Sequence, residues 1–428
     1  MKKRVLIITY YWPPAGGPGV QRWLKFVKYL PEFGIEPVVY IPENAHYPII
    51  DNDLEKEIGK DVEIIRYPIK EPYKMASLFS KKSTKDISSG IIPVQKKQKL
   101  TEKALLWIRG NFFIPDARIG WVNPSVSFLE DYLKKHPVDS IITTGPPHSV
   151  HLIGLKLKKM FSINWLADFR DPWTTIGYHK ELKLTDKAAQ KHKELEKKVL
   201  NTADHIIVTS PTTKREFEQI TKQPVSVITN GYDIERIQKQ PLDKEFTIAH
   251  IGSLLSNRNP RVLWKALAEL IKEEKGFKDH FRLKLIGKIS EEILSVLKEF
   301  HLEAYVHNMG YLSHTDALIQ QRTSQVLLLL EIDSEDTVGI IPGKLFEYMA
   351  AERPILSIGP EGADFSEIIR KTNTGVFHTY EDKEAIKQTL IHYYHQYLDQ
   401  NLKIYGMGLQ YYSRRKLTEK LAALLMAQ

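Results

Sequence analysis

Lys344 and Glu347 lie where a loop is expected to pass into a helix, a place that could bind an anion and a hydroxyl group. The stretch from Thr337 to Ile358 reads TVGIIPGKLFEYMAAERPILSI. Glycines and prolines before Lys344 prevent regular structure, and apolar residues around Glu347 then recur at helical spacing, followed by a buried strand at residues 355–358. Backbone N–H groups and the helix dipole attract anions at such a junction, and Lys344 adds a charge. The alternative is an ordinary connection with a surface lysine and glutamate.

Two more loops between a strand and a helix combine glycine with a polar or basic residue. Glycine lets the backbone pass close to a ligand, and N–H groups at the start of the following helix favour phosphate. The candidates are Gly16 and Gly17 after the first strand, and Gly252, Ser253 and Arg258 after a strand expected at residues 246–251. The second loop predicts a diphosphate cradle. Arg22, on the first turn of the helix after Gly17, is either another anion contact or a solvated surface side chain.

Acidic, basic and imidazole side chains follow two further strands. Asp168, Arg170 and Asp171 come at the end of a strand at residues 164–167, and His148 follows a Gly-Pro-Pro turn after another strand. Carboxylates are costly to bury without a partner, so they indicate either a site or a loop in which Arg170 neutralises both acids. His148 has a reference pKa near neutrality and suits a ligand or acceptor role, although a single histidine is usually structural.

These residues need parallel strands to bring them together, since the carboxyl ends of parallel strands share one edge of a sheet. Short apolar strands alternate with amphipathic helices in two consecutive series, which predicts an α/β fold of two doubly wound halves. We predict an N-terminal domain at residues 1–238 and a C-terminal domain at residues 239–404. The closing helix within residues 405–428 is expected to pack back on the first domain.

Composition narrows the class of protein. The 428 residues are 42% hydrophobic and 26% charged, with a formal net charge of +9 and no cysteine. Disulfides and thiolate metal sites are therefore excluded, and no apolar run reaches the roughly 20 residues of a membrane-spanning helix. We expect a cytoplasmic protein that attracts anions.

A lysine- and serine-rich stretch interrupts the first half at about residues 70–103. One interpretation is a disordered excursion. The other is peripheral contact with the anionic inner face of a cell membrane, because basic residues alternate there and just beyond with apolar ones such as Trp107 and Phe112. Nucleic acid is not expected as a partner, since no helix-turn-helix, zinc-finger or RNA-binding pattern is present.

Several motifs, taken in order, resemble the GT-B-fold glycosyltransferases of family GT4, the retaining type that uses nucleotide-sugar donors, in a bacterial branch. The resemblance covers nearly the whole chain. The motifs are YYWPPAGGPGVQRWLKFVKYL, TTGPPHS, ADFRDPW, ADHIIVTS, NGYD, GSLLSNRNP, PGKLFEYMAAERPIL and YYSRRKLTEKLAALL. The resemblance implies two Rossmann-like domains facing a central cleft, with acceptor binding in the first domain and nucleotide-sugar binding in the second.

The resemblance also implies roles for individual residues. Glu347 matches the glutamate that accepts hydrogen bonds from the donor's ribose hydroxyls. Ser253 and Arg258 occupy the family's basic pair on the diphosphate, with serine at the first position, so Lys344 is expected to supply the missing charge. Gly339 stands where the family usually has a second glutamate, which faces the donor sugar. Further donor contacts are expected at Gly287, Ile341, Pro342 and Leu345.

On the acceptor side, the family's histidine near the donor sugar corresponds to Arg170 or Asp171. We therefore expect Asp168, Arg170, Asp171 and His148 to orient the acceptor or the sugar. The implied reaction moves a sugar from a UDP- or GDP-sugar to a hydroxyl of a glycan or lipid-linked glycan, in surface polysaccharide assembly, without a metal or other cofactor. The alternatives are a nucleotide-sugar epimerase on the same fold and a catalytically silent nucleotide-sugar-binding protein.

Overall fold

The computed structural model describes residues 2–69, 100–180, 182–233 and 240–427 of the 428-residue chain. The chain divides into two compact units, one comprising Met1–Asn230 with Arg414–Gln428 and the other Gly231–Ser413. The sequence placed these boundaries after residue 238 and after residue 404. Most of the lysine- and serine-rich stretch, residues 70–99, lies outside the described residues.

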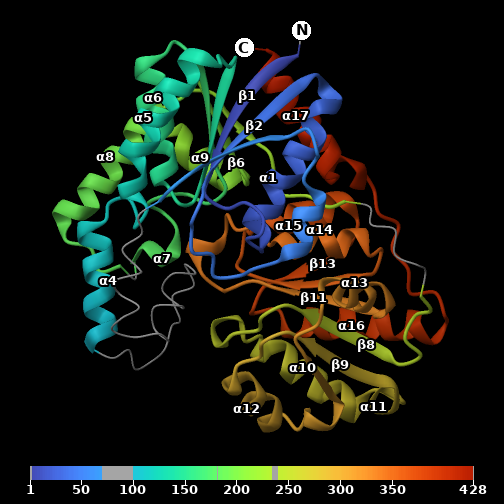
Figure 1. The fold of residues 1–428 in the computed structure, drawn as a ribbon. Coiled ribbons are helices and arrows are strands. Elements are labelled where there is room, and N and C mark those ends of the chain that lie inside the picture. The colour runs from blue at the N-terminus through green and yellow to red at the C-terminus, as the bar shows by residue number, and fades with distance from the viewer. Residues whose placement is uncertain (1, 70–99, 181, 234–239, 428) are drawn as a thin grey trace. The chain divides into compact units, whose positions relative to one another are not determined.

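The first unit is built on a seven-stranded parallel sheet with the order β3-β2-β1-β4-β5-β6-β7 (Figure 1). Its strands are β1 (Lys3–Thr9), β2 (Ile35–Pro42), β3 (Glu63–Tyr67), β4 (Ser140–Gly145), β5 (Asn164–Phe169), β6 (His205–Val208) and β7 (Val225–Val227). Its helices are α1 (Pro18–Tyr29), α4 (Leu100–Phe112), α5 (Ile119–Lys135), α6 (Ser149–Met160), α7 (Gly177–Lys180), α8 (Asp186–Thr202), α9 (Pro211–Glu218) and α17 (Arg414–Met426), with 3-10 turns η1 (Leu30–Phe33) and η2 (Asn52–Glu57).

Both faces of this sheet are covered, which is why its strands read as continuous apolar runs. Helices α5, α6 and α8 lie on one face of the sheet and α1 and α17 on the other (Figure 1). In β1, Leu6 and Ile8 belong to the core on the first face, whereas Val5 and Ile7 belong to the core on the second. The closing helix α17 therefore belongs to the core of the first unit although it ends the chain.

The second unit contains a six-stranded parallel sheet with the order β10-β9-β8-β11-β12-β13. Its strands are β8 (Phe246–Ile251), β9 (Phe281–Ile286), β10 (Val306–Gly310), β11 (Val326–Leu330), β12 (Ile355–Ile358) and β13 (Gly375–His378). Its helices are α10 (Arg261–Glu273), α11 (Phe277–His280), α12 (Glu291–Glu299), α13 (His314–Thr323), α14 (Gly343–Ala350), α15 (Asp364–Thr372) and α16 (Lys383–Leu398), with η3 (Ser256–Arg258), η4 (Glu303–Tyr305), η5 (Glu335–Thr337) and η6 (Leu409–Tyr412).

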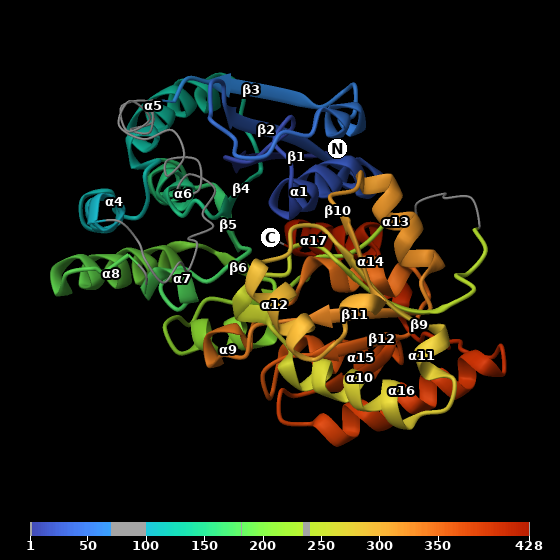
Figure 2. The same cartoon turned by 90° about the horizontal axis from the view of Figure 1, so that it is seen from below.

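The helices of the second unit also cover both faces of their sheet. Helices α10 and α16 run side by side on one face (Figure 2), and α14 and α15 contribute to the core on the other. The strand order reverses direction at β8, with β9 on one side and β11 on the other. Ligands of open parallel sheets bind where the order reverses, beyond the carboxyl ends of the strands. This edge therefore positions the loops after β8, β9 and β11 for binding.

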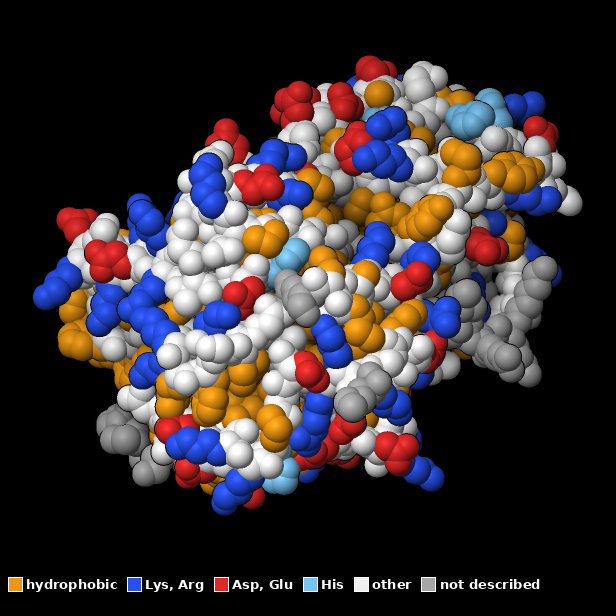
Figure 3. Space-filling model, turned by 90° about the horizontal axis from the view of Figure 1, so that it is seen from above, with side chains coloured by type: hydrophobic (Ala, Val, Ile, Leu, Met, Phe, Trp, Pro, Cys, Tyr) orange, Lys and Arg blue, Asp and Glu red, His pale blue; other side chains and the backbone are white. Residues whose placement is uncertain are grey.

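On the face drawn in Figure 3, the net charge is not gathered into one patch. On the face in Figure 3, basic and acidic side chains of the described residues are interspersed, and orange apolar areas lie between them. Within the part of the chain that the structure describes, no helix is long and apolar enough to span a membrane.

Candidate functional site

Two glycine-containing loops meet backbone to backbone at the carboxyl edge of the second sheet. Gly252, after β8, and Gly287, after β9, have φ angles of +122° and +115°, which favour glycine. The N–H of Gly252 donates to the carbonyl of Ile286 at 2.7 Å. A side chain on Gly287 would place its Cβ 2.6 Å from the Gly252 carbonyl oxygen. Only glycines let these loops approach so closely and leave their edge open.

Arg258 lies at the end of the first loop and is held by a buried carboxylate. Its Nε and Nη2 donate to Glu331 Oε1 at 3.2 and 3.0 Å, and the N–H of Ile332 donates to the same oxygen at 2.8 Å. The Glu331 side chain is 1% exposed, whereas that of Arg258 is 28% exposed. The guanidinium therefore has a fixed inner edge and a solvent-facing remainder.

Lys344 brings a second cation to the same place. It is the second residue of α14, and its Nζ lies 2.9 Å from where a Cβ on Gly252 would be. Burial and the neighbouring Arg258 lower the pKa of Lys344 to about 8, against the effect of Glu331 and Glu347. No hydrogen bond or ion pair joins this ammonium to another described residue, so its charge is left for a ligand.

Glu347 lies one turn further along α14 and is oriented by a glutamine. Gln321 of α13 donates from Nε2 to Glu347 Oε2 at 3.0 Å. Since an ionised carboxylate only accepts, the amide oxygen of Gln321 must face away, where it is buried without a hydrogen-bond partner among the described residues. Glu347 itself is half-buried, so a diol can reach its other lone pairs.

The remaining donor-site candidates of this unit differ in how far they are exposed to solvent. Ser253 is exposed on the loop, and Ile341 is half-buried before α14. Pro342 is the N-cap of α14, and Leu345, whose side chain is fully buried in the core, donates its N–H to the Pro342 carbonyl at 3.0 Å. The side chain of Leu345 therefore supports the helix rather than facing a ligand.

In the first unit, Gly16 and Gly17 lead into α1. Gly17 is the N-cap, with a φ of +101°, and the first turn of α1 contains no acidic residue. The Gly16 N–H donates to the Ile49 carbonyl at 2.9 Å, and a Cβ on Gly16 would lie 2.9 Å from an Ile49 methyl group. Gly16 thus fixes the loop, while nothing lies within 4 Å of a Cβ position on Gly17.

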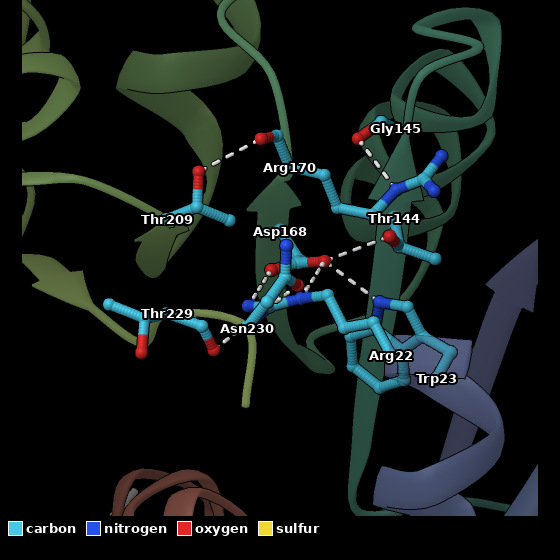
Figure 4. A network of polar contacts seen from close by, with 9 residues as sticks. All are labelled: Arg22, Trp23, Thr144, Gly145, Asp168, Arg170, Thr209, Thr229 and Asn230. Carbon is cyan, nitrogen blue, oxygen red and sulfur yellow. Dashed lines mark hydrogen bonds and ion pairs between the residues drawn. The ribbon is translucent and has the colours of Figure 1, made fainter. Parts of the chain in front are cut away.

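Asp168 is buried beneath this loop in a network of polar contacts. Figure 4 shows its carboxylate between Arg22, Trp23 and Thr144, which approach it at 2.8 Å through Nη2, Nε1 and Oγ1, respectively. Burial raises the pKa of this carboxyl, but Arg22 and the other hydrogen bonds outweigh it, so the pKa is lowered. Asp168 is 0% exposed. It can orient α1 against the sheet, but it does not face a substrate.

The contacts of Arg22 and Arg170 correct two expectations from the sequence. Arg22 is 5% exposed rather than solvated, and it also donates to the Thr229 carbonyl at 2.8 Å. Arg170, which was considered as the neutraliser of both acids, instead extends toward Gly145 (Figure 4), where its Nε donates to the carbonyl at 3.3 Å. Alternation along a strand would place Asp168 and Arg170 on one face, but β5 ends at Phe169, so Arg170 lies beyond the strand and takes another direction.

Among the described residues, no ion pair joins Arg170 to a carboxylate or Asp171 to a cation. The Arg170 guanidinium donates to the carbonyls of Gly145 and Pro146 and lies 5.8 Å from the ring of Tyr11. Burial raises the pKa of Asp171, whereas Arg170 lowers it; the net change is upward. Both residues are partly exposed, in contrast to the fully buried Asp168.

His148 is 5% exposed and stacks on Trp173, with ring centroids 5.0 Å apart and planes 4° from parallel. Neither ring nitrogen has a hydrogen-bond partner in the described residues. Burial, with the nearby His151 and Arg170, keeps its pKa well below the ordinary value. His148 is therefore a neutral imidazole at working pH.

We expect the buried histidines to make the protein sensitive to mild acid. Burial lowers the pKa of His151 to about 3 and of His179 to about 4, and it also lowers those of His148 and His192. The unfolded chain binds these protons near pH 6.5, so below that pH it binds more protons than the folded state. The free energy of unfolding should thus fall between pH 6.5 and about 4, by up to about 1.4 kcal/mol per pH unit for each histidine.

Denaturant titrations at several pH values would measure this slope. His148→Phe preserves a flat ring on Trp173 and removes one titrating group, so its slope should be shallower than that of the wild type. His136→Phe, at an exposed position, is the matched control and should leave the slope unchanged. Equal slopes for His148→Phe and the wild type would contradict the prediction.

The structure therefore assembles one cluster in each unit. Arg258, Lys344 and Glu347 gather in the second, and Arg170, Asp171 and His148 in the first. Sequence reasoning missed Glu331 and Gln321, which hold Arg258 and Glu347. The sequence does hold a signal for Glu331, because a carboxylate that directly follows a run of four leucines must lie at the end of a buried strand. No group of histidine and acidic residues in the described ranges is arranged to hold a metal ion.

Comparisons with known proteins find a matching family model for a segment of each half of the chain. Residues 93–236 match the family model "Glycosyltransferase Family 4", and residues 245–396 match "Glycosyl transferases group 1". No curated protein matches the chain.

Solved structures with the same fold cover almost the whole chain. The lipopolysaccharide outer core galactosyltransferase WaaB has a TM-score of 0.58 at 15% identity and covers 99% of each chain. Anabaena Alr3699/HepE in complex with UDP and glucose has a TM-score of 0.58 at 12% identity and covers 100% of each chain. A putative UDP-N-acetylglucosamine 2-epimerase from Listeria monocytogenes has a TM-score of 0.55 at 12% identity, covering 100% of this chain and 96% of that one. The fold is GT-B, with two Rossmann-like domains.

Proposed function

We infer from the two domain matches and the GT-B fold that the chain is a glycosyltransferase similar to those of family 4. We propose that it moves a sugar from a UDP- or GDP-sugar to a hydroxyl group of a glycan acceptor, with retention of the anomeric configuration. The observation that carries the donor assignment is Lys344, an ammonium without a partner in the described residues, beside Arg258 and the glycine loops.

The two cations suit a diphosphate leaving group. When the bond between the sugar's anomeric carbon and the diphosphate oxygen breaks, that oxygen gains negative charge. Arg258 and Lys344, placed before the reaction, stabilise this charge without reorganisation. The acceptor oxygen forms the new bond to the anomeric carbon, and its proton passes to the leaving phosphate. These cations supply the charge that a metal would otherwise bring, so we expect EDTA to leave the rate unchanged.

The ribose of the donor is proposed to bind Glu347. A carboxylate accepts two hydrogen bonds from neighbouring hydroxyls, and charged acceptors bind them about twice as strongly as neutral ones. Gln321 fixes one oxygen at 3.0 Å, which leaves the carboxylate pre-oriented. In the first unit, Arg170 and Asp171 are proposed to orient the acceptor or the donor sugar, and the buried His148 is proposed to support them from behind.

The acceptor is proposed to be a bacterial surface glycan, on a lipid carrier or free, because the galactosyltransferase WaaB of the same fold is named for the lipopolysaccharide outer core. Peripheral membrane contact is part of this proposal. Trp107, Ile108 and Phe112 of α4 are 41%, 43% and 70% exposed, and they directly follow the lysine-rich stretch. Retention on anionic but not neutral vesicles at low salt would support it, and absence of retention would remove it.

A nucleotide-sugar epimerase is the second candidate, favoured by the fold shared with the Listeria protein. Incubation with UDP- and GDP-sugars separates the candidates. Nucleoside diphosphate released only in the presence of an acceptor supports transfer, whereas conversion of the sugar nucleotide alone supports epimerisation. Binding without either reaction would identify a silent nucleotide-sugar-binding protein.

The same assay tests Glu347. Glu347→Gln keeps the shape but removes the charge, so the donor KM should rise about 10- to 100-fold, the equivalent of a hydrogen bond to a charged group. Glu367→Gln, in an exposed pair with Arg370 on α15, is the control and should behave as the wild type. An unchanged KM with every active donor would remove Glu347 from the site.

A further inference from the structure

Glu331 is a buried carboxylate at the centre of the proposed donor site. It directly follows β11, and its side chain is 1% exposed. One oxygen, Oε1, accepts from Arg258 Nε, from Arg258 Nη2 and from the N–H of Ile332. The hydroxyl of Tyr380 donates to its backbone carbonyl at 2.7 Å. Arg258 and the neighbouring Ile332 N–H thus fix the carboxylate, and Tyr380 fixes the backbone that carries it.

This geometry determines which part of Arg258 remains for a ligand. Guanidinium groups offer five N–H donors in a rigid plane. Glu331 takes the edge formed by Nε and Nη2, so Nη1 has no hydrogen bond to any described residue. An arginine on the short η3 turn would otherwise sample many rotamers. Because Glu331 holds Nε and Nη2, the guanidinium points its Nη1 in one fixed direction.

The carboxylate also sets the charge balance around Lys344. The groups that face this ammonium are Arg258, Glu331, Glu347 and the buried His250. His250 is neutral, since burial and both cations keep its pKa well below the ordinary value. Arg258 repels the charge on Lys344, and Glu331 offsets part of that repulsion.

We propose that Glu331 is a positioning residue of the donor site, which aims Arg258 at the diphosphate and keeps Lys344 charged beside it. This inference rests on the proposed function. Glu331 does not touch the donor; it allows two cations to stand together in a half-buried place before the anion arrives. Without it, their repulsion favours loss of the proton from Lys344.

Binding of UDP to the intact protein, measured by calorimetry from pH 7 to 10, tests the proposal. Above pH 7 the diphosphate is already ionised, since its last proton leaves near pH 6. In the wild type, affinity should fall as the pH rises through about 8, where Lys344 loses its proton. In Glu331→Gln this midpoint should move down by about 1 pH unit, because a nearby opposite charge has been removed.

Three variants make the result specific. Glu299→Gln, in the exposed pair with Arg261 of the same unit, should keep the wild-type midpoint. Lys344→Met should show no affinity change around pH 8. Glu331→Asp keeps the negative charge on a side chain one methylene group shorter. The pH midpoint of its UDP affinity should lie between those of the wild type and Glu331→Gln. If Glu331→Gln does not fold, the Glu331→Asp shift decides alone.

The failures are distinguishable. If UDP and GDP do not bind the wild type, the proposed function fails. If UDP binds the wild type and the midpoint stays the same in the folded Glu331 variants, Glu331 only stabilises the fold and the inference is overturned. A purely structural role would lower the melting temperature without moving the pH midpoint.

Discussion

Lys344→Met is expected to lower the turnover of donor and acceptor about 10²- to 10³-fold, which is the usual cost of removing one preorganised donor to a developing anion. Methionine fills similar space, so α14 and the glycine loops should keep their packing. The loss follows from the reaction: the diphosphate gains charge as the sugar leaves, and an interaction that strengthens in the transition state lowers the barrier. The effect should appear mainly in kcat, with a smaller change in donor KM.

The control for this variant is another lysine of the same unit. Lys278→Met, at an exposed position on α11, removes the same charge from the surface and should retain wild-type turnover. Rates would be measured as release of nucleoside diphosphate at pH 7, where Lys344 carries its proton. Turnover within a factor of two of the wild type would mean that Lys344 does not serve the leaving group.

Much of the fold could be predicted because buried parallel strands have a simple pattern. The predicted strand at residues 355–358 coincides with β12, and that at 246–251 with β8. One strand was missed. β3 (Glu63–Tyr67) was not predicted, since it is a half-exposed edge strand that mixes charged and apolar residues.

The candidate site was less accessible to sequence reasoning. Glycine loops and the Lys344–Glu347 spacing are local, so the sequence could indicate them. The pair of Arg258 with Glu331 joins residues 73 positions apart, and that of Arg22 with Asp168 joins residues 146 positions apart. Such partners depend on strand order and on which face each side chain takes, and no local pattern encodes either.

Asp168→Asn is expected to destabilise the first unit by about 3–5 kcal/mol, the usual result of removing one member of a buried ion pair. Asparagine has nearly the same shape, but it is neutral, so the Arg22 guanidinium remains buried with its charge uncompensated. Trp23 and Thr144 would also lose a charged acceptor. For a unit of this size, the melting temperature should fall by roughly 6–20 °C.

An exposed pair in the same unit provides the matched control. Glu32 accepts from Arg415 at 2.6 Å, with side chains 41% and 62% exposed, so Glu32→Gln should cost no more than about 1 kcal/mol. Replacing both buried partners, in Arg22→Met with Asp168→Leu, should recover part of the loss, since neither variant side chain needs a counter-charge. If Asp168→Asn is no less stable than Glu32→Gln, the buried pair does not hold α1 against the sheet. A loss of stability that the double variant relieves would instead identify the unpaired guanidinium as its cause.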